Sequence, residues 1–138
     1  MYYAIILHEV FIVIWSILIK FNFIMKRKTL CFDIDGVICK TIKKKYKSAK
    51  PIKKSIDLIN RLYKKNYIII FTARYMGRNK DNISKAKAQG YKRTHAQLKK
   101  WGLNFHELRF GKPSYDLFVD DKNIFFRKNW HNNFKKYI

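Results

Sequence analysis

Short apolar runs alternate along the chain with segments whose apolar residues recur at helical spacing. The runs Thr29–Phe32 and Tyr67–Phe71 predict buried strands, and the second of them ends at Thr72. Residues His106–Phe110 predict a further short strand, and Leu117–Val119 predict the last. Because strands alternate with helices, the pattern predicts βαβ units and a parallel sheet, hence an α/β fold.

Two helices follow from apolar periodicity. Pro51 suits the first turn of a helix. The apolar residues after it recur at helical spacing: Ile52, Ile56, Ile59 and Leu62. Residues 124–138 predict a terminal amphipathic helix.

The long polar stretch 73–93 is predicted to have helical character around Ile83–Ala88. Thr94 is followed three residues later by Gln97, which resembles a capping box. This pattern predicts that a separate helix begins at Thr94 and ends at Gly102.

The first 24 residues are almost wholly apolar, and we treat 1–24 as a leader and 25–138 as one domain. One interpretation starts the functional chain at Met25 and makes the leader an upstream extension of the reading frame. Another makes the leader a membrane anchor, with the basic residues that follow it keeping the domain on the cytoplasmic side. A third makes it a packed helix. All three predict a cytoplasmic domain.

The chain carries 31 Lys and Arg against nine Asp and Glu, a formal net charge of +22. Two interpretations are open: a polyanionic partner such as nucleic acid or a membrane, or the residue bias of A/T-rich codons. The two cysteines, Cys31 and Cys39, form no pair with zinc spacing. Cys31 lies inside a predicted strand, so we expect a small core residue and a reducing cytosol.

Four of the nine acids form two tight pairs, Asp33/Asp35 and Asp120/Asp121, and each pair follows an apolar run. Carboxylates at the carboxyl ends of parallel strands meet outside one edge of the sheet, where open α/β folds bind ligands. Clustered carboxylates repel one another unless a cation or a shared proton lies between them. Oxygen ligands favour Mg²⁺.

Four elements follow in order: Asp33-Ile34-Asp35-Gly36-Val37, Thr72, Lys112, and Asp120-Asp121. In this order the chain resembles the haloacid dehalogenase (HAD) superfamily, whose motifs are DxDx[TV], Ser/Thr, Lys and a terminal acidic pair. The resemblance covers about residues 28–125. It implies a three-layer, Rossmann-like parallel sheet.

The resemblance implies that Asp33 is a nucleophile that forms an aspartyl-phosphate and that Asp35 is the general acid and base. It also implies that Thr72 and Lys112 hold the phosphate oxygens, with Lys112 neutralising phosphate and carboxylate together.

The same resemblance implies a Mg²⁺ site. An oxygen of Asp33, the backbone carbonyl of Asp35 and the carboxylate of Asp120 would bind the ion, and Asp121 would act through water or orient the shell.

Only 38 residues separate Asp33 from Thr72, which leaves no room for a sizeable cap domain. The chain therefore resembles the capless subgroup, whose sites are closed by a neighbouring subunit in a homo-oligomer or act on large substrates. The strand end Phe71–Arg74 and residues 111–116 are also similar to phosphatases encoded with capsule or surface-polysaccharide genes. Arg74 is then either a contact for a second anionic group of the substrate or a solvated arginine.

The resemblance implies a Mg²⁺-dependent phosphomonoester hydrolase that acts on a phosphorylated small molecule such as a sugar phosphate. One alternative keeps the chemistry and makes the substrate a nucleic-acid end, as in a 3′-phosphatase. The other is a non-enzymatic, basic binding or membrane-associated protein on the same scaffold.

Overall fold

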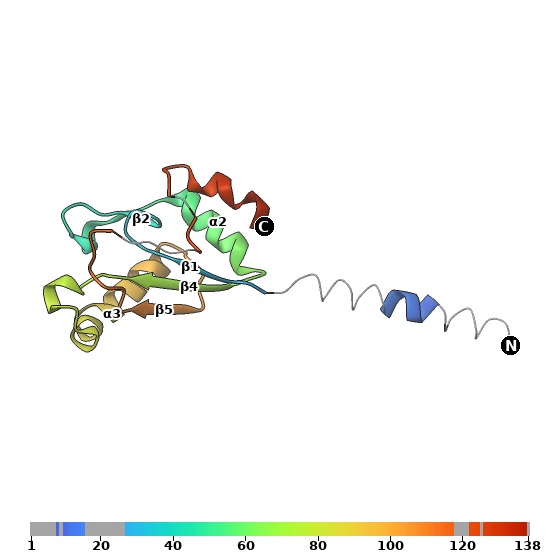
Figure 1. The fold of residues 1–138 in the computed structure, drawn as a ribbon, viewed down its shortest axis with the longest axis horizontal. Helices are drawn as coiled ribbons and strands as arrows, with labels where there is room; N and C mark the ends of the chain where they lie inside the picture. The colour runs from blue at the N-terminus through green and yellow to red at the C-terminus, as the bar shows by residue number, and fades with distance from the viewer. Residues whose placement is uncertain (1–7, 9, 16–26, 118–121, 125, 138) are drawn as a thin grey trace.

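Three parallel strands form the main sheet of the computed structural model, which describes residues 8, 10–15, 27–117, 122–124 and 126–137 (Figure 1). The strands are β1 (Thr29–Phe32), β4 (Tyr67–Thr72) and β5 (Glu107–Phe110), with β4 in the centre. Leu30 pairs with Ile68, and Ile70 pairs with Leu108. The described residues thus have a mixed α/β fold with a parallel sheet, and the strands predicted at 29–32, 67–72 and 106–110 are confirmed.

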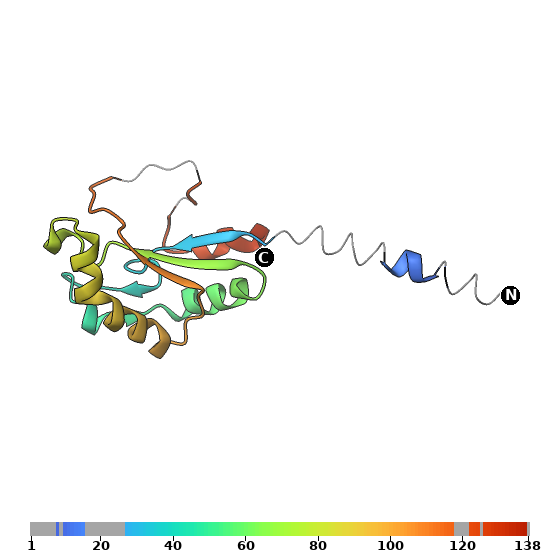
Figure 2. The same cartoon turned by 90° about the horizontal axis from the view of Figure 1, so that it is seen from below.

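Helices α2 (Lys53–Tyr63) and α3 (Ile83–Lys100) connect the strands and lie on the same face of the sheet (Figure 2). The strand order explains this placement, because two successive right-handed crossovers in one direction put both helices on one side. Helix α2 buries Ile56, Leu58, Ile59 and Leu62 against that face. The apolar periodicity predicted this helix.

The segment between β1 and α2 carries two very short strands, β2 (Cys39–Lys40) and β3 (Lys50–Pro51), which pair antiparallel. A 3₁₀ turn, η1 (Tyr46–Ser48), lies between them. The prediction that Pro51 begins the helix is wrong, since Pro51 belongs to β3 and α2 starts at Lys53. Pro51 has no backbone N–H to donate. It is tolerated here because β2 and β3 form a two-stranded sheet, so both are edge strands.

Helix α3 is one continuous helix, and the prediction of a separate helix starting at Thr94 is wrong. Its N-cap is Asn82, whose side chain accepts a hydrogen bond from the Lys85 backbone N–H. Thr94 is instead a buried interior residue, one of four spaced four apart along the packed face: Ala86, Gly90, Thr94 and Leu98. Burial of this stripe outweighs the local capping preference of Thr94. The predicted end is confirmed, because α3 stops just before Gly102, whose φ is +74°.

Gly90 lets α3 approach the ring of Tyr75. A Cβ at this position would lie 2.2 Å from Cδ2 and 2.3 Å from Cε2 of Tyr75. The ring cannot easily move, because it is buried between neighbouring rings: it is stacked with Phe110 and tilted against Tyr46. Close backbone approach therefore explains a glycine in mid-helix.

Gly90→Ala is expected to lower the free energy of unfolding. Helix propensity alone would raise stability by about 1 kcal/mol. Overpacking costs about 1–3 kcal/mol, so we expect a net loss of up to about 2 kcal/mol in urea unfolding. Ala88→Gly at an exposed position of the same helix is the control, and it should lose about 1 kcal/mol through propensity alone. A Gly90→Ala variant more stable than the wild type would contradict the close contact.

The carboxyl-terminal segment is helical over a shorter range than predicted. Of the described residues in this segment, those of Trp130–Tyr137 (η3) are helical, and η3 is a 3₁₀ helix, so the predicted amphipathic helix over 124–138 is wrong in extent and type. Trp130 and Phe134 pack on Phe32, with ring centroids 5.9 and 5.8 Å away. His131 is within hydrogen-bond distance of Ser55 on α2, with Nε2 and Oγ 2.8 Å apart. These aromatic contacts hold the segment beside β1 and α2.

Two other predictions fall partly outside the described residues. In the predicted strand 117–119, Leu117 is described and lies outside any strand, while 118 and 119 are outside the described residues. In the leader, residues 10–15 form a helical turn with exposed apolar side chains. Among the described residues no helix is both long enough and apolar enough to cross a membrane.

Candidate active site

Asp33 and Lys112 meet at the carboxyl ends of β1 and β5, although they are 79 residues apart in the sequence. Lys112 Nζ lies 3.1 Å from Asp33 Oδ2, and the Ile34 backbone N–H donates to Asp33 Oδ1 at 2.8 Å. Gly111, with φ of +108°, makes the turn that directs Lys112 toward β1. The pair is partly buried, with 30% of the Asp33 side chain and 12% of the Lys112 side chain exposed.

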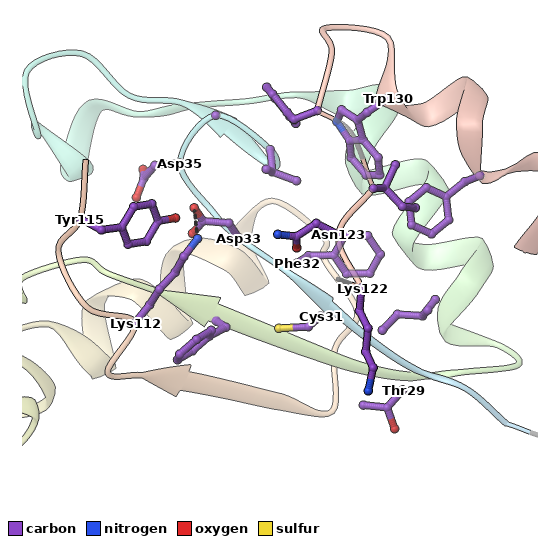
Figure 3. Close-up of a pocket in the computed structure, with 17 residues that line it drawn as sticks. Thr29, Cys31, Phe32, Asp33, Asp35, Lys112, Tyr115, Lys122, Asn123 and Trp130 are labelled. Carbon is purple, nitrogen blue, oxygen red and sulfur yellow. Dashed lines mark hydrogen bonds and ion pairs between the residues drawn. The ribbon is translucent and has the colours of Figure 1, made fainter. Parts of the chain in front are cut away.

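This pair opens into a cleft of about 850 Å³ (Figure 3). Its walls come from β1, from the turn after it, from residues 122–124 and from aromatic residues of the carboxyl-terminal segment: Phe126, Trp130 and Phe134. Cys31 lines the cleft and is exposed, so the prediction that it is a core residue is wrong. The register explains this, because Cys31 pairs with Ile69, whereas their neighbours Phe32, Ile68 and Ile70 pack in the main core. Successive residues of a strand face opposite sides, so Cys31 lies on the other face of the sheet. The buried cysteine is Cys39.

Asp35 lies in the turn after Asp33 and is held by Arg74, which follows β4. Arg74 Nε donates to Asp35 Oδ2 and Nη2 donates to Oδ1, both at 2.8 Å. The Thr41 hydroxyl also donates to Oδ1. Two parallel N–H···O bonds fix the orientation of a carboxylate as well as its distance. Asp35 is therefore held in one rotamer.

Arg74 is itself buried, with 1% of its side chain exposed. Nη1 donates to Gln97 Oε1 at 2.8 Å, and the guanidinium carbon lies 4.8 Å from the centroid of the Tyr46 ring. Gln97 Nε2 donates in turn to the Tyr46 carbonyl at 2.7 Å. One residue of α3 thus links Arg74 to the loop that contains η1.

The two carboxylates have opposite pKa shifts. Burial raises the pKa of Asp33 above its usual value, and the hydrogen bond and charge of Lys112 offset only part of that. Burial also acts to raise the pKa of Asp35, but the hydrogen bonds and charge of Arg74, with Thr41 and Cys39, bring it below its usual value. Burial raises the pKa of the Cys39 thiol to about 11, which keeps it protonated at neutral pH.

Thr72 ends β4 and is fully buried. Its hydroxyl oxygen accepts a hydrogen bond from the Arg74 backbone N–H at 3.1 Å. Thr72 is not one of the described residues that line the cleft. The role of Thr72 as a phosphate ligand stays a prediction. Asp120 and Asp121 lie outside the described residues, so their predicted role as metal ligands also stays a prediction.

Of the predicted site residues, the structure brings Asp33 and Lys112 together and sets Asp35 beside them with Arg74. Arg74 uses its side-chain donors on Asp35 and Gln97, so its proposed contact with a second anionic group of the substrate stays a prediction. Sequence reasoning did not single out Gln97 or Thr41 for the site. The spacing of Gln97 from Thr94 resembles a capping box, which predicts a helix start and not a place in the site.

Comparisons with known proteins concern the fold alone. A crystal structure of a target protein from Vibrio cholerae aligns with 80% of this chain and 99% of its own length, with a TM-score of 0.66 and 23% sequence identity. No family model and no curated protein matches.

Proposed function

We propose that this chain is a Mg²⁺-dependent phosphomonoester hydrolase with a capless, Rossmann-like HAD core. The observation that carries the proposal is the Asp33–Lys112 pair, which sits in an open cleft with Asp35 two residues away. A carboxylate nucleophile, a cation for the phosphate and a second carboxylate are the groups that hydrolysis through an acyl phosphate requires. The order of the motifs in the sequence supports the same chemistry.

In the proposed reaction an Asp33 oxygen attacks phosphorus, and the bond from phosphorus to the leaving oxygen breaks. Water then attacks the aspartyl-phosphate, which releases inorganic phosphate and restores the Asp33 carboxylate. Lys112 Nζ, 3.1 Å from Asp33, balances the charge of the carboxylate and of the incoming phosphate.

Asp35 is the second carboxylate of this scheme. Arg74 favours its ionised form, which can accept a proton from the attacking water. To donate a proton to the leaving oxygen in the first step, Asp35 has to be protonated, as it is after the water step of the previous turnover, and the protonated oxygen has to release its bond from Arg74. The Asp35–Arg74 pair is therefore expected to rearrange during turnover.

The donor atoms at the cleft suit Mg²⁺ in kind. The Asp33 carboxylate and the Asp35 backbone carbonyl supply oxygen only, the ligand type that Mg²⁺ prefers. Among the described residues no three acidic, His or Cys side chains gather as a metal site, so the set would be completed by Asp120, Asp121 and water. Bound there, Mg²⁺ would lower the repulsion between the Asp33 carboxylate and an anionic substrate.

Removal of divalent cations is expected to abolish turnover. Hydrolysis of a general phosphomonoester should stop in excess EDTA and return with added Mg²⁺. Mg²⁺ at a hundred times its Kd should also stabilise the folded chain by about 2.7 kcal/mol, because unfolded chain lacks the assembled oxygens. Thermal unfolding with and without Mg²⁺ measures this.

The matched variants are Asp120→Ala and Asp116→Ala. Asp120→Ala should lose the Mg²⁺-dependent stabilisation, whereas Asp116→Ala, at an exposed position four residues earlier in the sequence, should keep it. Hydrolysis that is unaffected by EDTA would contradict the proposed function. An unchanged Mg²⁺ effect in Asp120→Ala would exclude Asp120 as a direct ligand.

A further inference from the structure

A second cleft, of about 660 Å³, lies between the η1 loop and α3. Three segments line it: residues 44–48, the Tyr75–Arg78 region with η2 (Gly77–Asn79), and the middle of α3. Five of its nine lining residues are cations, whereas Lys and Arg make up 31 of the 138 residues of the chain. The five are Lys44, Lys45, Lys47, Arg78 and Arg93. We name this set the basic cleft.

The basic cleft has no carboxylate in its lining. Among the described parts of the chain, none of its five cations takes part in an ion pair. Arg74, close by, has a carboxylate partner in Asp35. Like charges gathered in a concavity raise the local concentration of anions, and a bound anion relieves their repulsion. General enrichment in lysine does not explain cations that converge on one cleft without acids.

Aromatic rings orient one of the cations. The guanidinium carbon of Arg78 lies 5.0 Å from the Tyr75 ring centroid and 5.6 Å from that of Tyr46. An arginine held over ring faces loses less side-chain entropy on binding, and its N–H groups can contact phosphate oxygens in pairs. Tyr75 is buried and both rings face arginines, so the cleft offers phosphate contacts and little surface for base stacking.

The basic cleft adjoins the candidate active site. The Tyr46 ring has Arg78 on it and also Arg74, 4.8 Å away, and Arg74 binds Asp35. One ring and one guanidinium therefore separate the cleft from a carboxylate that lines the reaction site. Gln97 fixes this arrangement by bonding both Arg74 and the Tyr46 carbonyl.

We propose that the basic cleft binds the phosphodiester backbone of a single nucleic-acid strand without reading its sequence. Its end phosphate would reach Asp33, and that part of the inference rests on the proposed function. Five cations from three segments exceed what one additional phosphate of a small molecule requires. A concave site with spaced cations suits a strand with regularly spaced phosphates better than it suits a flat membrane surface.

The test measures binding separately from turnover. Fluorescence anisotropy of a labelled single-stranded 12-nucleotide DNA is titrated with the full chain at several KCl concentrations. The wild type should bind with an affinity that falls steeply with salt. Lys44→Gln/Arg78→Gln should bind at least tenfold more weakly at 50 mM KCl, and its log–log salt slope should be smaller by about 1.4, or about 0.7 for each lost phosphate contact.

The matched control is Lys64→Gln/Lys65→Gln, which removes the same charge from exposed positions after α2. It should bind DNA within twofold of the wild type. Lys45→Gln/Lys47→Gln is a second variant of the basic cleft, in case the first folds poorly, and should show the same loss. Equal losses in control and cleft variants would overturn the proposal, because binding would then follow net charge alone. Stronger cleft-dependent binding to anionic vesicles than to the strand would overturn it as well.

Hydrolysis distinguishes the two proposals. If the wild type cleaves a small phosphomonoester and also releases phosphate from a 3′-phosphorylated strand, cleft variants should lose far more of the second activity than of the first. If the chain binds DNA through the basic cleft but hydrolyses no phosphomonoester, the DNA-binding proposal is supported and the proposed function is refuted. If the chain hydrolyses a phosphomonoester but does not bind DNA through the basic cleft, the proposed function is supported and the DNA-binding proposal is refuted.

Discussion

Asp33→Asn is expected to lower turnover of a phosphomonoester by about 10⁴-fold or more, the scale seen when a catalytic nucleophile is removed. The amide has the same shape as the carboxylate, but it cannot attack phosphorus to form an acyl phosphate. Asp33 stands at the end of β1 with Lys112 3.1 Å away, so the replacement changes charge at the reacting group while the strand and its neighbours remain. Steady-state hydrolysis, with Mg²⁺ present, measures the loss.

The control is Asp57→Asn on α2, where the carboxylate forms only an exposed ion pair with Lys53. This variant should keep wild-type turnover. Thermal unfolding of Asp33→Asn should show a folded protein, because burial already raises the pKa of Asp33 and thus disfavours its charge. A folded Asp33→Asn protein with near wild-type turnover would exclude Asp33 as the nucleophile.

The sheet could be predicted from the sequence because each strand corresponds to a short apolar run of neighbouring residues. Tyr67–Thr72 is buried in the centre of the sheet, and a continuous apolar run is typical of that position. Parallel strands then place their carboxyl ends at one edge, which brought Asp33 and Lys112 together in the prediction as they are in the structure.

Helix α3 shows where local patterns fail. Thr94 and Gln97 have the spacing of a helix start, yet tertiary packing buries Thr94 within a longer helix. The glycine in the middle of α3 is explained by the ring of Tyr75, which leaves no space for a Cβ at position 90. The prediction that Cys31 is a core residue was wrong for a related reason. Alternation along an apolar run does not say which face of the sheet the helices will cover.

The support around Asp35 could not be predicted either. Arg74 lies 39 residues after Asp35 and Gln97 lies 23 residues after Arg74, so the contacts depend on how α3 crosses the sheet. A strand-end arginine suggested a substrate contact. In the structure its guanidinium is buried and bonded to Asp35 and Gln97, so positioning of Asp35 is a second possible role beside the substrate contact.

Arg74→Met is expected to lower stability more than Gly90→Ala does. It removes the bidentate partner of Asp35 and leaves Gln97 Oε1 without its donor. Breaking a buried ion pair from one side costs about 3–5 kcal/mol, and the partial exposure of Asp35 reduces this to about 2–4 kcal/mol. Urea unfolding measures the change. A loss below about 1 kcal/mol would show that the pair is not a structural support.

Arg74→Lys separates positioning of Asp35 from binding of substrate. Lysine keeps the charge but cannot hold both Asp35 oxygens at once, so the Asp35 carboxylate gains rotational freedom. If Arg74 positions Asp35, kcat should fall about 10–100-fold, as expected when a proton-transfer group is misplaced, with KM within about threefold of the wild type. If Arg74 instead holds an anionic group of the substrate equally in ground and transition states, KM should rise while kcat stays unchanged.

Gln97→Met is the companion variant. It leaves Arg74 in place but removes the acceptor of Arg74 Nη1 and the hydrogen bond from Gln97 to the η1 loop. A kcat loss in both variants without a change in KM would assign Arg74 and Gln97 to one positioning chain that ends at Asp35. A rise in KM alone, in Arg74→Lys, would contradict that chain and restore the substrate contact expected from the sequence.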